Sequence, residues 1–406
     1  MTFALDERRR ARTALTVSFM GNGIMSGALV ARLADVKSGL HLTNAQLGTA
    51  LLICSLACFA SMAPVSRIVS RLGSGPAVML GVSAYAVTFP FVGLRSSVHV
   101  LWLALVVWGF ALTIHEVAMN SHAVALEHVY GRRIMTVQHA TWSMGQLAGV
   151  AVGGVLSQVH FSVFWHFALT AGVVVSVAWM VRPWLLPANV DRHEPTPRRA
   201  RPRSTLRLRH LPYFFLALGL LGLCESIGEG AAGNWGAILA RDSYHAGPLL
   251  STTPYVVYAI VMVIGRLSGD RLATRFSTRS ILVVSGLVIA GGLGVGMVMN
   301  SLAGEFLAWT FLGVGCSNVI PLLFSAAGRA ARTRPTAGLR PASALALVTA
   351  IAYSGSLVGP PSVGYLSDLV TLHWALLLPA ALGLVLAVGV LGVLRRDEDP
   401  FEVETP

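Results

Sequence analysis

Twelve long apolar runs dominate the sequence, and a membrane-spanning α-helix needs about 20 such residues. They form two sets of six, at 13–33, 45–69, 76–94, 98–125, 134–158 and 162–184, and at 211–240, 253–272, 279–299, 302–326, 342–366 and 373–394. Twelve spans of this kind use roughly 240–300 residues. Because the chain has 406 residues, little is left for loops or for another domain. We therefore predict an all-α membrane protein with twelve transmembrane helices in two six-helix bundles.

The composition excludes a soluble globular protein. Only 12% of the residues are charged, whereas globular domains carry about 25%. The segment 185–210 is rich in Pro and Arg and lacks apolar periodicity, so we expect a basic cytoplasmic linker there. The linker separates an N-terminal bundle at 1–184 from a C-terminal bundle and short tail at 211–406.

The basic residues predict the orientation of these helices. Of the 30 Lys and Arg residues, all but four fall in the termini, the linker and the loops on one side of the membrane. The exceptions are Arg32, Lys37, Arg95 and Arg241. By the positive-inside rule, both termini are cytoplasmic. Membrane insertion thus explains the net charge of +12, and we expect no nucleic-acid partner.

Weak internal symmetry relates the two halves. The second span of each half is followed by a similar basic turn, SRIVSRLGSG at 66–75 and DRLATRFSTR at 270–279. Both turns resemble the loop motif Gly-x-Leu-x-Asp-Arg-x-Gly-Arg-Arg of the major facilitator superfamily. Arg71 and Gly73 match it in the first turn; Leu272, Arg275 and Arg279 match it in the second. The resemblance implies two parallel repeats with the substrate bound between them.

A narrower resemblance runs from about residue 13 to residue 394. It rests on LADVKSGLHLTNAQLG at 33–48, HEVAMNSHAVALE at 115–127, IMTVQHATWSMGQLAG at 134–149 and YSGSLVGPPSVGYLSD at 353–368. These runs are similar to a bacterial branch of the superfamily that includes a rhizopine-transport protein and uncharacterised inner-membrane proteins. The resemblance implies a monomeric multi-pass transporter of the bacterial inner membrane. Because the sequence has no His/Cys group with metal-site spacing, we expect no metal, and we expect no cofactor.

Ionisable groups inside spans are functional candidates by default, because burying them in lipid costs at least about 2.5–3.5 kcal/mol. Glu116 lies in the cytoplasmic half of the fourth span, and His139 lies at a similar depth in the fifth. The two side chains could share a transported proton. The alternative is a polar latch that only joins the two helices.

Glu225 and Glu229 lie one turn apart near the middle of the seventh span. Two carboxyl groups on one helical face at that depth resist joint ionisation, which favours a proton-carrying or cation-binding role. The alternative is that Glu229 hydrogen-bonds a carbonyl freed by the neighbouring glycines.

Other polar residues are candidates for substrate contacts or for gating. The substrate candidates also have structural interpretations, as helix–helix hydrogen bonds or core aromatic residues; they are Asn22, Asn120, Tyr255, Tyr258, Asn318 and Tyr353. The gating candidates lie at the helix ends and in the basic turns; they are Arg32, Asp35, Arg71, Arg266, Asp270, Arg271 and Arg275. For Arg32, extension of the side chain to the interface is an equal alternative.

We predict a proton-coupled transporter that exports a small polar or amphipathic metabolite or drug by alternating access. The fifth span carries Gly145, Gly149, Gly153 and Gly154 in a pattern similar to the superfamily's antiporter motif, with Val150 in place of its Pro. The first alternative is proton-driven uptake of a sugar-like or cyclitol solute, and the second is a membrane sensor that does not transport. We expect no enzymatic activity, because the sequence lacks hydrolase, metal-site and phosphate-loop motifs.

Overall fold

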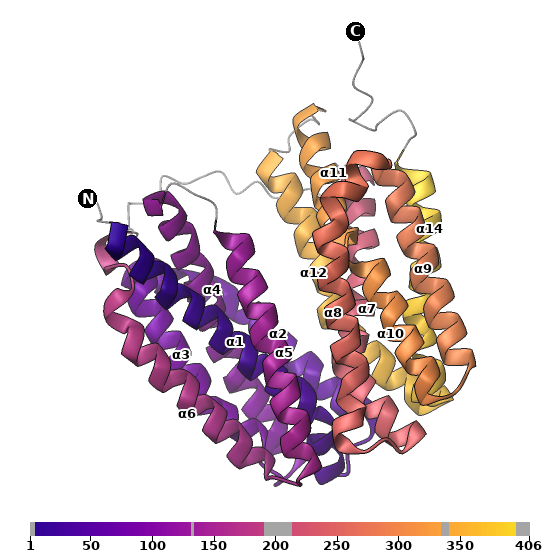
Figure 1. Ribbon diagram of the computed structural model, residues 1–406, viewed down its shortest axis with the longest axis horizontal. Coiled ribbons are helices and arrows are strands. Elements are labelled where there is room, and N and C mark those ends of the chain that lie inside the picture. The colour runs from indigo at the N-terminus through magenta and orange to yellow at the C-terminus, as the bar shows by residue number, and fades with distance from the viewer. Residues whose placement is uncertain (1–4, 131–133, 191–212, 334–340, 395–406) are drawn as a thin grey trace. The chain divides into compact units, whose positions relative to one another are not determined.

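The computed structural model describes residues 5–130, 134–190, 213–333 and 341–394, which form α-helices and short turns (Figure 1). No β-strand occurs within these four ranges. The chain divides into two compact units. The first contains residues 1–46 and 50–201, and the second contains residues 47–49 and 202–406.

Within its described residues, the first unit holds six long helices and two short 3₁₀ helices. They are α1 (Leu5–Gly39), α2 (Asn44–Leu72), α3 (Ser74–Val92), α4 (Val98–Tyr130), α5 (Met135–Gln158), α6 (Val163–Val181), η1 (Arg182–Trp184) and η2 (Ala188–Val190). The described helices of the second unit are α7 (Tyr213–Tyr244), α8 (Pro248–Arg275), α9 (Thr278–Val298), α10 (Leu302–Cys316), α11 (Val319–Thr333), α12 (Pro341–Val370), α13 (Leu372–Ala375) and α14 (Leu377–Val393).

Each of the twelve predicted spans coincides with a helical segment, and the predicted all-α membrane fold is confirmed. The span predicted at 302–326 consists of α10 and α11, which a break at Ser317 and Asn318 separates. Across the described residues, ten helical stretches are long and apolar enough to cross a membrane. The other two long helices, α5 and α12, pack against the first helix of their own unit, α1 and α7 respectively.

Local sequence signals mark where several helices begin. Before α2, the side chain of Thr43 accepts a hydrogen bond from the Gln46 backbone at 3.2 Å, and the Gln46 side chain accepts one from the Thr43 backbone at 3.0 Å. This reciprocal capping box satisfies two amide groups that the helix leaves free. Ser277 and Ser301 cap α9 and α10 with single bonds of the same type.

Glycine brings the backbones of α1 and α5 into direct contact. A Cβ atom on Gly27 of α1 would overlap the carbonyl oxygen of Gln146, and one on Gly149 of α5 would overlap the carbonyl oxygen of Ile24. Lipid provides little hydrophobic driving force between helices, so small residues and close packing hold such pairs together. The antiporter-like glycines of the fifth span therefore have a packing role within the first unit.

The second unit repeats this arrangement between α7 and α12. A Cβ atom on Gly355 of α12 would overlap the carbonyl oxygen of Leu223, and Gly359 packs on Ile227. In both units the first and fifth spans thus make a glycine-mediated contact. This is structural support for the internal repeat seen in the sequence.

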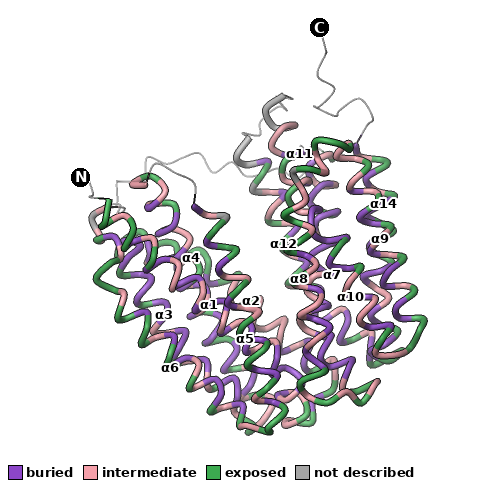
Figure 2. The backbone as a smooth tube through the Cα atoms, viewed as in Figure 1, coloured by how far each residue is buried: buried purple, intermediate pink, exposed green. Residues whose placement is uncertain are grey.

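The outer surfaces of both units carry large apolar side chains. Figure 2 shows buried and exposed positions alternating around the helices, as expected for helices with one face in a bundle. Met180 is 75% exposed and Leu267 is 79% exposed. Extensive exposure of this kind is unfavourable in water but suits contact with acyl chains.

We expect Gly27→Ala to lower the apparent melting temperature of the purified protein, because an added methyl group at this contact forces the α1 and α5 backbones apart at a cost of about 1–3 kcal/mol. Gly172→Ala is the matched control, since nothing lies within 4 Å of its added Cβ atom. Differential scanning fluorimetry in detergent compares the two variants. Equal melting temperatures would contradict the close packing described for α1 and α5.

Candidate functional site

A buried chain of hydrogen bonds links α1, α4 and α5 in the first unit. His115 of α4 has no exposed surface, and its Nε2 lies 2.9 Å from the Oγ of Ser18. Its Nδ1 lies 3.1 Å from the Nδ2 of Asn22, and Asn22 is also fully buried. The Oδ1 of Asn22 accepts a hydrogen bond from the Nε1 of Trp142 at 2.7 Å.

The indole of Trp142 determines which atom donates and which accepts in each hydrogen bond of this network. The indole N–H of Trp142 can only donate, so the Asn22 oxygen accepts and the Asn22 amide nitrogen is left to donate. His115 Nδ1 is therefore the acceptor, and the proton of the neutral ring lies on Nε2, pointing at Ser18. A second proton on His115 would set two donors against each other at the contact with Asn22. The geometry thus favours a neutral imidazole that joins three helices.

The predicted polar residues of the first unit occupy different environments. Asn22, expected to contact the substrate, has both ends of its amide engaged inside the bundle. Glu116 is exposed on α4, and its carbonyl oxygen accepts a bond from the Asn120 side chain at 2.9 Å. His139 is exposed and lies edge-on to Phe19, with ring centroids 5.4 Å apart. A proton relay between Glu116 and His139 stays a prediction.

The second unit gathers several of the predicted residues around two carboxyl groups of α7. Glu225 is 1% exposed and Glu229 is half-buried. Glu225 Oε2 accepts a bond from Ser226 at 3.4 Å, and its Oε1 has no hydrogen-bond partner among the described residues. Arg266 of α8 interacts electrostatically with both carboxyl groups.

Three tyrosines lie within electrostatic range of the same carboxyl pair. The three are Tyr255 and Tyr258 on α8 and Tyr353 on α12, and each interacts electrostatically with Glu229. Tyr255 and Tyr258 are buried with ring centroids 5.7 Å apart, whereas Tyr353 is 52% exposed. Two acidic groups, an arginine and aromatic rings therefore lie together within one unit. Such a set can bind a cation through charge and through the faces of the rings.

Asn318 ties α8 to the break between α10 and α11. Its Nδ2 donates to the carbonyl oxygen of Gly265 at 3.1 Å and to the hydroxyl of Ser317 at 2.9 Å. We expected this amide either to contact the substrate or to form a hydrogen bond between helices. In the structure it satisfies a carbonyl of a different helix.

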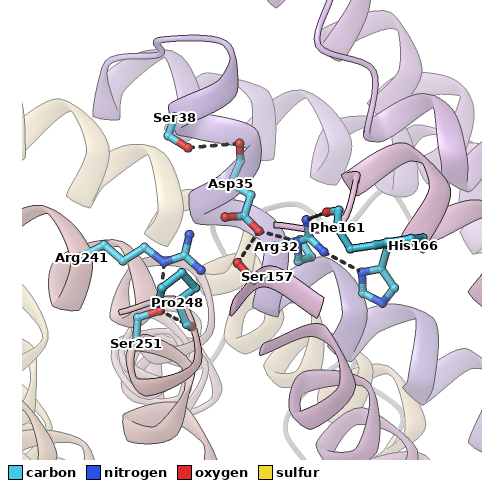
Figure 3. A network of polar contacts seen from close by, with 9 residues as sticks. All are labelled: Arg32, Asp35, Ser38, Ser157, Phe161, His166, Arg241, Pro248 and Ser251. Carbon is cyan, nitrogen blue, oxygen red and sulfur yellow. Dashed lines mark hydrogen bonds and ion pairs between the residues drawn. The ribbon is translucent and has the colours of Figure 1, made fainter. Parts of the chain in front are cut away.

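The gating candidates Arg32 and Asp35 form an ion pair inside the first unit (Figure 3). Arg32 is 1% exposed and donates to the carbonyl oxygen of Phe161, with His166 Nδ1 3.5 Å from its second terminal nitrogen. Asp35 accepts from the hydroxyl of Ser157 at 2.7 Å. The pair thus fastens α1 to α5, to α6 and to the loop between them. Its role as a gate stays a prediction.

The remaining gating candidates lie near the ends of α2 and α8. Arg71, Arg266, Arg271 and Arg275 are exposed. The side chain of Asp270 lies outside the part of the chain that the structure describes, so its role in gating also stays a prediction.

Sequence reasoning missed Glu305 in α10. This carboxyl is fully buried, and its Oε1 accepts a hydrogen bond from the indole nitrogen of Trp309 at 2.8 Å. Oε2 has no hydrogen-bond partner among the described residues. A lone Glu inside a long apolar run is itself a signal for a polar site in the membrane.

The fold and these sites define a polytopic membrane carrier, and sequence comparison places it in a family. The chain belongs to the Major Facilitator Superfamily, whose family model matches residues 12–339. It is 29% identical to membrane protein MosC of Rhizobium meliloti, over 92% of this chain and 88% of that protein. It is 28% identical to an uncharacterized MFS-type transporter of Yersinia pestis, over 95% of this chain and 96% of the relative.

A solved structure shows the same fold. The crystal structure of a bacterial homolog of the human lysosomal transporter Spinster aligns with a TM-score of 0.73 and 14% identity, covering 96% of this chain and 98% of that one. The predicted superfamily and bacterial branch are confirmed. The protein is a multi-pass membrane secondary transporter with a small-molecule substrate.

We expect Trp142→Phe to destabilise the first unit, because it removes the donor to Asn22 and leaves a buried amide oxygen unsatisfied, at a cost of about 1–3 kcal/mol. Trp165→Phe is the matched control, since Trp165 is 59% exposed. Thermal unfolding in detergent should show a lower melting temperature for Trp142→Phe alone. Equal melting temperatures for the two variants would contradict the hydrogen bond that Trp142 donates to Asn22.

Proposed function

We propose that the protein exports a cationic, amphipathic small molecule in exchange for protons, with the α7 carboxyl pair as the coupling site. The carrying observation is Glu225, a carboxyl group that is 1% exposed and has one oxygen without a hydrogen-bond partner among the described residues. A buried polar atom with no partner is costly. A proton or a bound cation relieves that cost.

Charge balance explains why cargo and proton would exclude each other. When both Glu225 and Glu229 are ionised, Arg266 offsets one negative charge and the second remains. A proton or a cationic amine neutralises it, and occupancy by one removes the attraction for the other. Tyr255, Tyr258 and Tyr353 add aromatic faces that suit an organic cation. Competition of this kind couples the two fluxes in an antiporter that works by alternating access.

The other polar residues have supporting roles in this proposal. Glu116 and His139 would form a second proton site in the first unit, with Asn120 beside them. Asn22 and Asn318 would respond to cargo through the helix contacts that they make. Arg32, Asp35, Arg71, Asp270, Arg271 and Arg275 would act at the helix ends as the units change conformation, and Arg266 would contribute to gating through its charge near the α7 carboxyl pair.

The organisation that we propose follows the charge distribution. It consists of an N-terminal bundle at 1–184, a basic linker at 185–210 and a C-terminal bundle at 211–406. The transporter would act as a monomer in a bacterial inner membrane, with both termini in the cytoplasm. It would have no enzymatic activity.

The first test measures binding of a permanently charged quaternary ammonium probe to the purified protein. We expect binding to weaken from mildly alkaline to mildly acidic pH, because protons neutralise the carboxyl pair while the charge of the probe stays constant. Glu229→Gln should weaken binding about tenfold to a hundredfold, the loss expected for one charge-assisted contact of about 1.5–3 kcal/mol. Glu305→Gln is the control, since it alters a buried carboxyl in another helix. Binding that is independent of pH and of Glu229 would refute the proposal.

The second test measures transport in proteoliposomes. With an acidic lumen, an antiporter accumulates the probe inside, and Glu225→Gln should abolish this accumulation while exchange of labelled for unlabelled probe continues. Failure to accumulate the probe with an acidic lumen, together with uptake of sugars or cyclitols when the lumen is alkaline and protons flow inward, would favour symport instead. Specific binding without any flux would favour a sensor.

A further inference from the structure

The chain after α6 is folded back onto the first unit by a second buried histidine. His122 of α4 has no exposed surface, and its Nε2 accepts a hydrogen bond from the backbone N–H of Leu186 at 3.4 Å. Its Nδ1 must then carry the proton, which it donates to Ser74 Oγ at 2.8 Å. Leu186 is 4% exposed and belongs to the apolar core of the unit. Residues 185–190, expected to begin the linker, are thus packed against α3.

This fold-back borders an open pocket of about 760 Å³ between α3 and the end of α6, which we call the cavity. One wall consists of Met79, Leu80 and Ser83 of α3, and the opposite wall includes Arg182 and Pro187. Trp179 of α6 completes the cavity and donates a hydrogen bond from Nε1 to Ser83 at 3.2 Å. The cavity is therefore largely apolar, with a cation and an indole ring at one end.

Arg182 supplies the charge of this cavity. Its guanidinium carbon lies 5.1 Å from the centroid of the Trp179 ring, a distance at which cation and ring attract. The side chain is exposed, and among the described residues no carboxylate forms an ion pair with it. Several guanidinium donors thus remain available for an anion, and a planar guanidinium suits phosphate oxygens.

The cavity adjoins an apolar outer surface that is suited to contact with lipid. Large apolar side chains are exposed along both helices that border it, with Val87 of α3 at 68%, Val173 of α6 at 64% and Met180 at 75%. The charge distribution predicts that the start of α3 and the end of α6 are cytoplasmic. A molecule in the cavity would therefore have its chains beside this apolar surface and its polar end at the cytoplasmic headgroup level.

We propose that this cavity binds the headgroup of an anionic phospholipid from the cytoplasmic leaflet. Arg182 would pair with the phosphodiester, Trp179 would lie at the interface, and an acyl chain would run along Met79 and Leu80. The fold-back held by His122 would present the arginine to the lipid. Interfacial basic pockets of this type recognise anionic headgroups, and aromatic residues are enriched at the same depth.

The test uses delipidated full-length protein in detergent and short-chain dioctanoyl phosphatidylglycerol as the probe. We expect this lipid to raise the melting temperature more than dioctanoyl phosphatidylcholine does, while inorganic phosphate has no effect. Arg182→Gln should remove at least half of the difference between the two lipids. Ser83→Leu, which fills the cavity and keeps the arginine, should do the same. Arg67→Gln, at another exposed arginine of the same unit, is the control and should retain the difference.

Two results would overturn the proposal. If Arg182→Gln keeps the full difference between phosphatidylglycerol and phosphatidylcholine, the arginine does not select the headgroup. If inorganic phosphate stabilises the protein as much as phosphatidylglycerol does, the site binds free anions and not lipid. Native mass spectrometry of the same samples provides an independent readout, because it counts retained phosphatidylglycerol molecules in the wild type and in Arg182→Gln.

Discussion

Hydrocarbon offers no hydrogen-bond partners, and the remaining features of the structure follow from that constraint. Backbone amides must be satisfied within each span, which leaves helices as the building element. Helices in lipid gain little from apolar contact, so the close pairs depend on glycine, at α1 with α5 and at α7 with α12. The same constraint makes each polar side chain in a span costly unless another group satisfies it.

Two sets of polar residues meet this constraint in different ways, one in each unit. In the first unit, His115, Asn22 and Trp142 form a chain in which each donor faces an acceptor, and the chain joins three helices. In the second unit, Glu225 keeps an oxygen with no hydrogen-bond partner among the described residues. A satisfied network resists change, whereas an unsatisfied carboxyl attracts a proton or a cation. The contrast favours stability as the role of the first set and coupling as the role of the second.

The fold was largely predictable because hydrophobic length is a local property of the chain. Each of the twelve apolar runs became a helical segment, and the two basic turns indicated the superfamily. The site was less predictable. Asn22 was a reasonable candidate for a cargo contact, but its partners are 93 and 120 residues away in sequence. Nothing in the local pattern of α1 reveals that both ends of its amide are engaged.

The sequence alone determined that this chain crosses a membrane repeatedly, that it contains two related halves, and that several polar residues, among them Glu116 and Glu225, fall inside its apolar runs. Length, apolarity and charge bias are local properties of each segment. Membrane insertion depends on the same local properties, so the sequence is enough to predict it. The tertiary structure decided which of those polar groups are satisfied and which are not. It also decided that residues after α6 return to cover His122 and leave Arg182 beside an apolar cavity. These outcomes depend on which helices become neighbours, and that choice is made by packing across the whole bundle.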